Sequence, residues 1–350
     1  MIMAYQNFTK VSVTVINKLQ SIYQGFIELN WPQKLLVGVI IMLTATFIFR
    51  ALTPEQAPFQ PAVLSNRTIT ESNLKNIDFK GSYPNVPTQL PTATIEYKNI
   101  KEELLQKILA AFDIPSTPVS QNLWKGSQYQ VAKVETPEIY VLTRLGEPED
   151  VPANLESINS QTALVEATKI IDGLYQADLK PTALTAKIKI LGQDEHGLDG
   201  GQIDRPFVKV PFVFTMEKIP LFIEKDTVYA ATITLDSSYE LQKAEFRPYT
   251  VKVLDTKSYS TIAPSEALAR LNQNQGTVIN YMYLGPNEVD FSNVKSGIME
   301  TADVEYRVDL TTNTAAPYYK FSGIIIDGDS YDIESDVVTP AIKTNFSDTE

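Results

Sequence analysis

The sequence predicts an α+β protein, in which an N-terminal transmembrane helix precedes an extracytoplasmic body of antiparallel sheets, each packed by a short helix. Three observations predict this class. Fifteen uncharged residues run from Leu35 to Phe49, between Lys34 and Arg50. Many later segments alternate apolar and polar residues, as strands with one buried face do. Helical patterns occur in a few short segments, and strands follow them.

The uncharged run is the candidate membrane anchor, which we place at residues 34–52. A spanning helix needs about 17 to 25 residues, because each residue rises about 1.5 Å across a hydrocarbon core of about 30 Å. The flanking Lys34 and Arg50 can extend their charges to the headgroups. The anchor positions that we single out are Leu35, Val39, Leu43 and Phe47.

A buried core helix and the hydrophobic part of a cleaved signal peptide are the two alternatives for this run. Cleavage is disfavoured because 34 residues precede the run and no A-x-A-like site follows it. Three lysines on the N-terminal side, against the single Glu28, favour a cytoplasmic N-terminus. The sequence therefore predicts a single-pass protein of the cell membrane with its body outside the cytoplasm.

Residues 1–33 are too few for a domain and predict a cytoplasmic amphipathic helix. Its apolar side chains recur at the spacing of a helical seam, at Val15, Leu19, Ile22 and Phe26. One interpretation is a helix that rests on the inner leaflet. The other is a seam for a partner helix, which would make the protein a homo-oligomer or join it to another membrane protein.

Composition narrows the class of partner. The net charge is −12, and it becomes −15 without residues 1–50, which hold four basic residues and one acidic residue. A body this acidic argues against binding to nucleic acid or to an anionic lipid surface. The chain has no cysteine, so disulfides, thiolate zinc sites and cysteine nucleophiles are excluded. A cysteine-free ectodomain is more typical of a prokaryotic cell envelope.

Between the anchor and the body, residues 53–96 contain six prolines and predict a semi-extended stalk. A first α+β domain is expected at residues 97–258. Its helices are predicted near residues 100–113 and 162–174, where apolar side chains share one face. Its strands are predicted near residues 128–135, 138–144, 186–191, 208–216, 228–236 and 244–254.

A second α+β domain is expected at residues 259–350. Pro264 suits the first position of a short helix that ends near Leu271. Strands are predicted near residues 278–284, 302–310, 318–326 and 331–338, and Asp327-Gly328 is a hairpin signal. Because both regions read as a helix followed by antiparallel strands, a duplicated unit is expected, at about 160–256 and 260–345.

Three segments of this second domain carry a family resemblance. Residues 265–271 (SEALARL), 279–283 (INYMY) and 316–323 (APYYKFSG) resemble a PepSY-like module, a helix followed by a strand pair. The order of anchor, stalk and modules resembles the membrane-anchored regulators of the YycH/YycI type. That resemblance implies a non-enzymatic partner of an envelope-sensing kinase. The acidic, polar insertion between Tyr283 and Glu305 departs from the pattern of such modules.

Motifs of known chemistry are few. His196 is the only histidine and lies in an acidic loop, so a Ser–His–Asp triad and a zinc site are both disfavoured. That loop and residues 327–334 are acidic, but neither fits the EF-hand calcium pattern. Ser292 and Lys295 match S-x-x-K without its companion motifs. The sequence thus predicts no catalytic residue, no metal ligand and no cofactor.

Tyrosines are the most suggestive side chains, since several fall on neighbouring predicted strands. Aromatic residues on a sheet either close the core against a helix or form a groove for a ligand. Both interpretations stay open, and the candidate binding surface consists of Tyr281, Tyr283, Tyr318 and Tyr319.

The function expected from the sequence is binding or regulation at a prokaryotic cell envelope, through a protein partner and without catalysis. One alternative is an envelope glycan hydrolase, which would need two carboxyl groups about 5 to 10 Å apart in a cleft. A self-associating structural component of the envelope is another.

Overall fold

The computed structural model describes residues 74–146, 158–177, 179–191, 206–224, 226–283, 289, 291–329 and 331–343. The chain divides into two compact units, Met1–Ala57 and Pro58–Glu350, and every described residue belongs to the second. The predicted anchor at 34–52, the seam at residues 15–26 and His196 lie outside the described residues. None of the helices within the described ranges has the length and apolar character that a membrane crossing requires.

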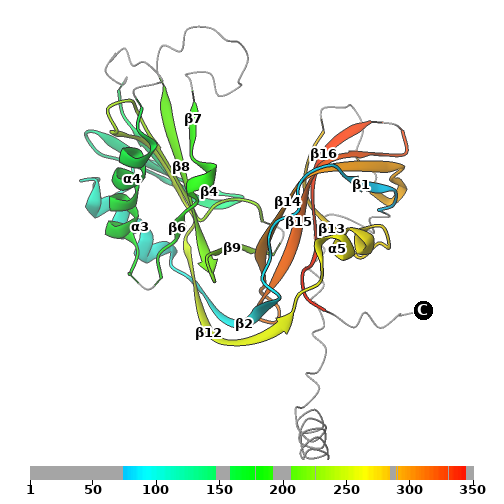
Figure 1. The fold of residues 1–350 in the computed structure, drawn as a ribbon. Helices are drawn as coiled ribbons and strands as arrows, with labels where there is room; N and C mark the ends of the chain where they lie inside the picture. Colours follow the sequence, from blue (N-terminus) through cyan, green and yellow to red (C-terminus); the bar gives the residue numbers. More distant parts are fainter. Residues whose placement is uncertain are drawn as a thin grey trace, which may run out of the picture. The chain divides into compact units, whose positions relative to one another are not determined.

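Sixteen strands dominate the described part and form one connected sheet (Figure 1). The main path through it runs β12-β2-β15-β14-β9-β8-β10-β11-β5-β4-β3, and the other strands pair beside this path. The strands are β1 (Ile77–Phe79), β2 (Gln89–Asn99), β3 (Leu123–Lys125), β4 (Tyr129–Glu135), β5 (Glu138–Arg144), β6 (Thr182–Ala183), β7 (Lys189–Leu191), β8 (Phe207–Met216), β9 (Ile219–Ile223), β10 (Ala231–Leu235), β11 (Leu241–Phe246), β12 (Tyr249–Ser260), β13 (Thr277–Met282), β14 (Ser296–Asp309), β15 (Thr314–Ile326) and β16 (Asp332–Pro340).

The first hydrophobic core lies between two helices and strands β4, β5, β8, β10 and β11. Helix α3 (Lys101–Ala111) buries Leu104, Leu105, Ile108 and Leu109, which recur at helical spacing. Helix α4 (Ser160–Leu174) begins where the Asn159 side chain accepts hydrogen bonds from the backbone of Gln161 and Thr162, at 2.8 and 3.3 Å. Such a cap satisfies N–H groups that have no partner inside the helix.

A second core lies beside helix α5 (Pro264–Leu271), against β13, β14, β15 and β16. Pro264 occupies the start of this helix, where its missing N–H costs nothing. Ala267 and Leu271 are the buried residues of the helix. A third core joins β2, β8, β9, β12, β14 and β15. The predicted helix bounds of residues 264–271 are confirmed.

The predicted fold class is wrong in its central statement. We expected a body of antiparallel sheets, each packed by a short helix, in duplicated units. The structure instead has one large mixed sheet, in which β14 pairs parallel with both β1 and β9. The three α-helices of the described ranges are unevenly shared, since α3 and α4 both cover the first core. Long-range parallel pairings leave no local sequence pattern, so periodicity did not indicate them.

The predicted stalk also differs from the structure over its second half. Residues 77–79 form β1, and residues 89–99 form β2, which pairs with β12 along its whole length. Leu90, Ala93 and Ile95 are buried in β2. Pro91 therefore lies within a strand rather than in a spacer. The domain boundary that we placed at residue 258 falls within β12, which ends at Ser260.

Candidate binding surface on the β13–β16 sheet

Strands β13, β14, β15 and β16 have one face on the second core and one face turned away from it. On β15, Phe321 and Ile325 are fully buried in the core, while Ser322 and Ile324 alternate with them. On β16, Ile333 and Val337 are buried in the same core, while Glu334 and Asp336 alternate with them. Successive strand residues point to opposite faces, so Ser322, Ile324, Glu334 and Asp336 share the face that is turned away from the core. We call it the outer face.

A hollow of about 700 Å³ lies at the outer face. Its volume is within the range of small-ligand and peptide sites. The residues around it come from all four strands and are Asn280, Tyr281, Met282, Glu300, Thr301, Ser322, Gly323, Ile324, Glu334, Ser335 and Asp336.

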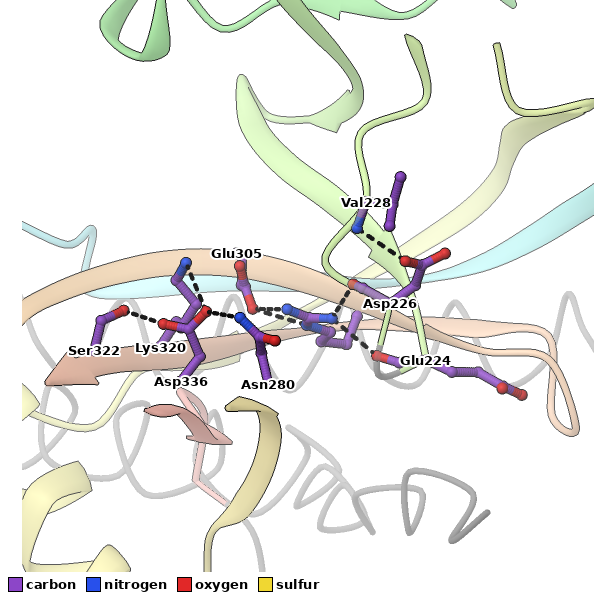
Figure 2. A network of polar contacts seen from close by, with 9 residues as sticks. Glu224, Asp226, Val228, Asn280, Glu305, Lys320, Ser322 and Asp336 are labelled. Atoms are coloured by element: carbon purple, nitrogen blue, oxygen red, sulfur yellow. Dashed lines mark hydrogen bonds and ion pairs between the residues drawn. The ribbon is translucent and has the colours of Figure 1, made fainter. Parts of the chain in front are cut away.

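Asp336 is the centre of a polar network beside the hollow (Figure 2). The Ser322 hydroxyl donates to its Oδ1 at 2.5 Å, and Asn280 Nδ2 donates to its Oδ2 at 3.4 Å. Lys320 Nζ lies 3.9 Å from Oδ2. The two strands that flank β16, β13 and β15, therefore both supply partners to this carboxylate, which fixes its orientation on the sheet.

The outer face continues along β14 to a buried ion pair. Arg307 and Glu305 are almost inaccessible to solvent, and Arg307 Nε donates to Glu305 Oε1 at 2.7 Å. Arg307 also donates to the carbonyl oxygens of Glu224 and Asp226, at 3.1 and 2.6 Å (Figure 2). Its guanidinium lies 5.0 Å from the centre of the Phe222 ring. The pair thus attaches the segment after β9 to β14 and has a structural role.

Apolar side chains lie exposed around the hollow. Met282 is 56% exposed and Ile324 is 37% exposed. Their strands flank β16. Met282 of β13 and Ile324 of β15 both lie opposite Glu334 of β16, one on each side of it. In this part of the chain β13 pairs only with β16, so its other edge has no neighbouring strand. An unpaired edge can accept a further strand.

The hollow has a negative electrostatic character. Glu300 and Glu334 are exposed, Asp336 is half-buried, and the lining residues that the structure describes include no lysine or arginine. The nearby Lys320 already pairs with Asp336. Exposed carboxylates beside unpartnered apolar side chains suit a ligand that carries cationic and apolar groups together.

The predicted tyrosine surface is wrong for two of its four residues. Tyr318 and Tyr319 are buried on opposite faces of β15, at 4% and 0% exposure. Tyr319 packs in the second core and its hydroxyl donates to the Ile262 carbonyl at 2.9 Å. Tyr318 packs with Ile279, Ala316 and Val338. Burial raises the pKa of Tyr319 to about 12 and raises the pKa of Tyr318 further above its ordinary value.

The other two tyrosines lie near the sheet edge. Tyr281 is 46% exposed, lines the hollow, and its ring centre is 5.1 Å from that of Phe291. Tyr283 packs against Tyr331 at 5.5 Å between ring centres. Burial is the main cause that raises the pKa of Tyr283, and Tyr331 and Asp327 add to it. Tyr281 is therefore the predicted surface residue that borders the hollow, but its ring lies on the core side of β13, since Tyr281 is opposite Ser335 and packs against Phe291.

The sequence analysis missed Met282, Ile324, Glu334 and Asp336. A signal for the two carboxylates was present, since Glu334 and Asp336 alternate with apolar residues in the predicted strand at 331–338. No signal showed that their face is left open, because that depends on which other elements cover it.

Metal ligation finds no support in the described ranges, which hold no group of three His, Cys, Asp or Glu side chains placed to bind an ion. In the acidic turn after β15, Asp327 Oδ1 accepts hydrogen bonds from the backbone of Asp329 and Tyr331, at 3.0 and 2.9 Å. This carboxylate therefore orders the turn.

Comparison with known proteins identifies no family. No family model and no curated protein matches the chain. Among solved structures, an uncharacterized protein from Eubacterium rectale matches with a TM-score of 0.44 and 11% identity, over 77% of this chain and 88% of that one. YycH from Bacillus subtilis matches with a TM-score of 0.34 and 10% identity, over 73% of this chain and 53% of its own. Since both TM-scores lie below 0.5, we base no inference on either likeness.

Proposed function

We propose that this protein binds a segment of a partner protein at the outer face of the β13–β16 sheet, and that binding rather than catalysis is its function. The observation that carries the proposal is the hollow of about 700 Å³, where the described lining residues combine exposed apolar side chains with carboxylates and include no lysine or arginine. The partner segment should therefore carry apolar residues interspersed with lysine or arginine.

Two kinds of contact support an extended segment as the ligand. Among the described strands one edge of β13 has no neighbour, and it can form main-chain hydrogen bonds with an added strand, as in other cases of strand addition. Met282, on the edge strand β13, can bury apolar area against the adjacent side chain of that segment, and Ile324, two strands farther in on β15, can contact a long side chain that reaches across the hollow. Burial of apolar surface contributes about 25 cal/mol per Å² before the cost of association is subtracted.

A place at the cell envelope is part of the proposal and rests on the sequence. The uncharged run from Leu35 to Phe49 and the lysine bias before it favour a body outside the cytoplasm. The regulatory role suggested by the PepSY-like segments would then be exerted through protein contacts at the membrane.

Binding of defined peptides to the full-length protein in detergent micelles tests the proposal. The probes are two labelled decapeptides, one alternating Lys with Leu and one alternating Glu with Leu, followed by fluorescence anisotropy. We expect the Lys–Leu peptide to bind and the Glu–Leu peptide to bind at least ten-fold more weakly.

Charge reversal identifies the surface. The double variant Glu300→Lys/Glu334→Lys should weaken binding of the Lys–Leu peptide at least ten-fold, because two attractive charges become repulsive. The control is Glu96→Lys, an exposed carboxylate on β2 that does not line the hollow. Equal affinity of both peptides, or an equal effect of the control, would contradict the proposal.

A further inference from the structure

A second hollow, distinct from the outer face of the β13–β16 sheet, gathers three lysines. It has a volume of about 360 Å³ and is lined by Lys187, Lys189, Leu191, Lys209, Pro211 and Tyr229. The lysines come from two neighbouring elements and from β8: Lys187 ends a 3₁₀ turn, η2 (Thr185–Lys187), and Lys189 begins β7. We call this the lysine hollow.

Strand pairing forces two of these cations together. Lys189 of β7 lies directly opposite Lys209 of β8 in an antiparallel pair. Opposed residues of such a pair have Cβ atoms about 5 Å apart and point to the same face. Like charges in this position repel one another and destabilise the sheet. The neighbouring Val208 and Val210 are fully buried in the first core, so the lysines lie on the face turned away from it.

The three lysines of this hollow form no ion pair with a carboxylate of the described residues. Ion pairs are found for other lysines on the strands of this sheet, but not for Lys187, Lys189 or Lys209 within the described part of the chain. Lys243 provides the contrast. It lies in the same row, since Thr234 of β10 pairs with both Lys243 and Lys209, and its Nζ is 2.9 Å from Glu245 Oε1.

Tyr229 adds a neutral hydrogen-bond donor at the hollow. Burial, and next the negative charge of Asp336, raise the pKa of Tyr229 above its ordinary value. The phenol therefore stays protonated at neutral pH and can donate to an anion.

We propose that the lysine hollow binds a phosphate-bearing anion. Three ammonium groups suit phosphate oxygens, which accept charge-assisted hydrogen bonds from lysine as a compact cation. A volume of about 360 Å³ accommodates more than a single phosphate group. Because the whole chain has a net charge of −12, long-range attraction does not draw anions to it, so recognition depends on this local cluster.

Two sources share this chemistry, a small phosphate compound and a polymer with phosphodiester or polyphosphate linkages. The experiment is isothermal titration of the full-length protein in uncharged detergent with inorganic phosphate, pyrophosphate and a long-chain polyphosphate, at 20 and 200 mM NaCl. We expect saturable binding of pyrophosphate or polyphosphate that weakens at the higher salt. Equal affinity per site for pyrophosphate and polyphosphate indicates that the natural ligand is a small compound. At least ten-fold tighter binding of polyphosphate than of pyrophosphate indicates a polymer.

Substitutions locate the binding. Lys209→Gln should weaken the anion at least ten-fold, and it should raise the midpoint temperature of unfolding without ligand, because it removes the repulsion with Lys189. Lys243→Gln is the matched control and should leave the affinity within two-fold. Absence of binding for all three probes would overturn the proposal, as would equal losses for both variants. Loss of stability in ligand-free Lys209→Gln would also overturn it, by showing that a carboxylate of the chain already compensates Lys209. These outcomes are measured separately from peptide binding at the β13–β16 sheet, and the two hollows share none of their described lining residues, although the charge of Asp336 acts on Tyr229.

Discussion

Arg307 and Glu305 lie two residues apart on β14 and form an ion pair that solvent hardly reaches. Arg307 Nε donates to Glu305 Oε1 at 2.7 Å and Nη2 donates to the same oxygen, while Nη1 donates to two carbonyl oxygens of the segment that follows β9. Nearly every polar atom of this buried group has a partner. The pair therefore holds the segment after β9 against β14, next to the place where these two strands pair in parallel.

Arg307→Gln should strongly destabilise the protein. It leaves the Glu305 carboxylate buried without its cation, which typically costs about 3 to 5 kcal/mol. The double variant Glu305→Gln/Arg307→Gln should lose less, because no buried charge stays uncompensated. Arg144→Gln is the control, since Arg144 pairs with Glu240 at the surface and such pairs contribute about 1 kcal/mol or less. Urea unfolding followed by tryptophan fluorescence measures the three free energies. Equal losses for Arg307→Gln and Arg144→Gln would contradict the structural role.

Gly323 should tolerate no side chain. A Cβ at this position would lie 2.2 Å from the Ile298 carbonyl oxygen and 2.6 Å from Met299 Cα, both on the neighbouring β14. Gly323→Ala therefore forces the two strands apart at the irregularity between Met299 and Thr301, at a cost of about 1 to 3 kcal/mol.

Gly173→Ala is the matched control for that substitution. Gly173 lies in α4 with nothing within 4 Å of an added Cβ, so alanine should stabilise the helix by about 0.5 to 1 kcal/mol. Thermal unfolding of both variants tests the contrast. A neutral Gly323→Ala would show that the strands are not in close approach there.

Alkaline pH should destabilise the fold through buried tyrosines. Burial raises the pKa of Tyr140, Tyr249 and Tyr319 to about 12 in the folded chain, from an ordinary value of 10.0. The folded state therefore holds these protons more tightly than the unfolded state does. The free energy of unfolding should be constant below about pH 9 and should fall between about pH 10 and 12, by about 1.4 kcal/mol per pH unit for each such tyrosine.

Absorbance at 295 nm during a pH titration detects the phenolates, and urea unfolding at pH 8 and 11 gives the free energies. Tyr319→Phe should lose less stability between these two pH values than the unmodified chain does. Titration of all tyrosines near pH 10 with the fold retained would contradict the burial of these hydroxyls.

Local elements followed from the sequence because their signals are local. The pattern around Pro264 predicted α5 with its observed bounds, and the apolar spacing of residues 104–112 predicted α3. Strands β4, β5, β14, β15 and β16 were also predicted, with ends that differ by several residues in β14 and β15.

Longer-range features could not be predicted in this way. The segment 244–254 was expected as one strand, but the chain turns at Pro248 and forms β11 and β12. The alternating apolar residues of β8 are all buried, as their spacing indicates, but the spacing could not show that Val210 lies in the first core and Phe214 in the third, because β8 pairs with β10 at one end and β9 at the other.

The candidate site, too, was predictable from the sequence only in its local features. Alternation could have indicated that Glu334 and Asp336 share one face of β16. It could not distinguish a covered face from an open one, and for that reason Tyr318 was grouped with surface residues. Its burial depends on Ile279 and Val338, which reach it from other strands.

The measurement that tests the proposed function most directly is a methyl NMR titration of the folded protein with the Lys–Leu decapeptide. Met282 and Ile324 carry the exposed methyl groups of the hollow, and Val253 and Leu254 on β12 are exposed apolar residues outside it. We expect saturable shifts of the Met282 and Ile324 methyl groups and none at Val253 or Leu254, with loss of the shifts in Glu300→Lys/Glu334→Lys. Shifts of equal size at all four residues, or none at Met282 and Ile324, would contradict binding at the outer face.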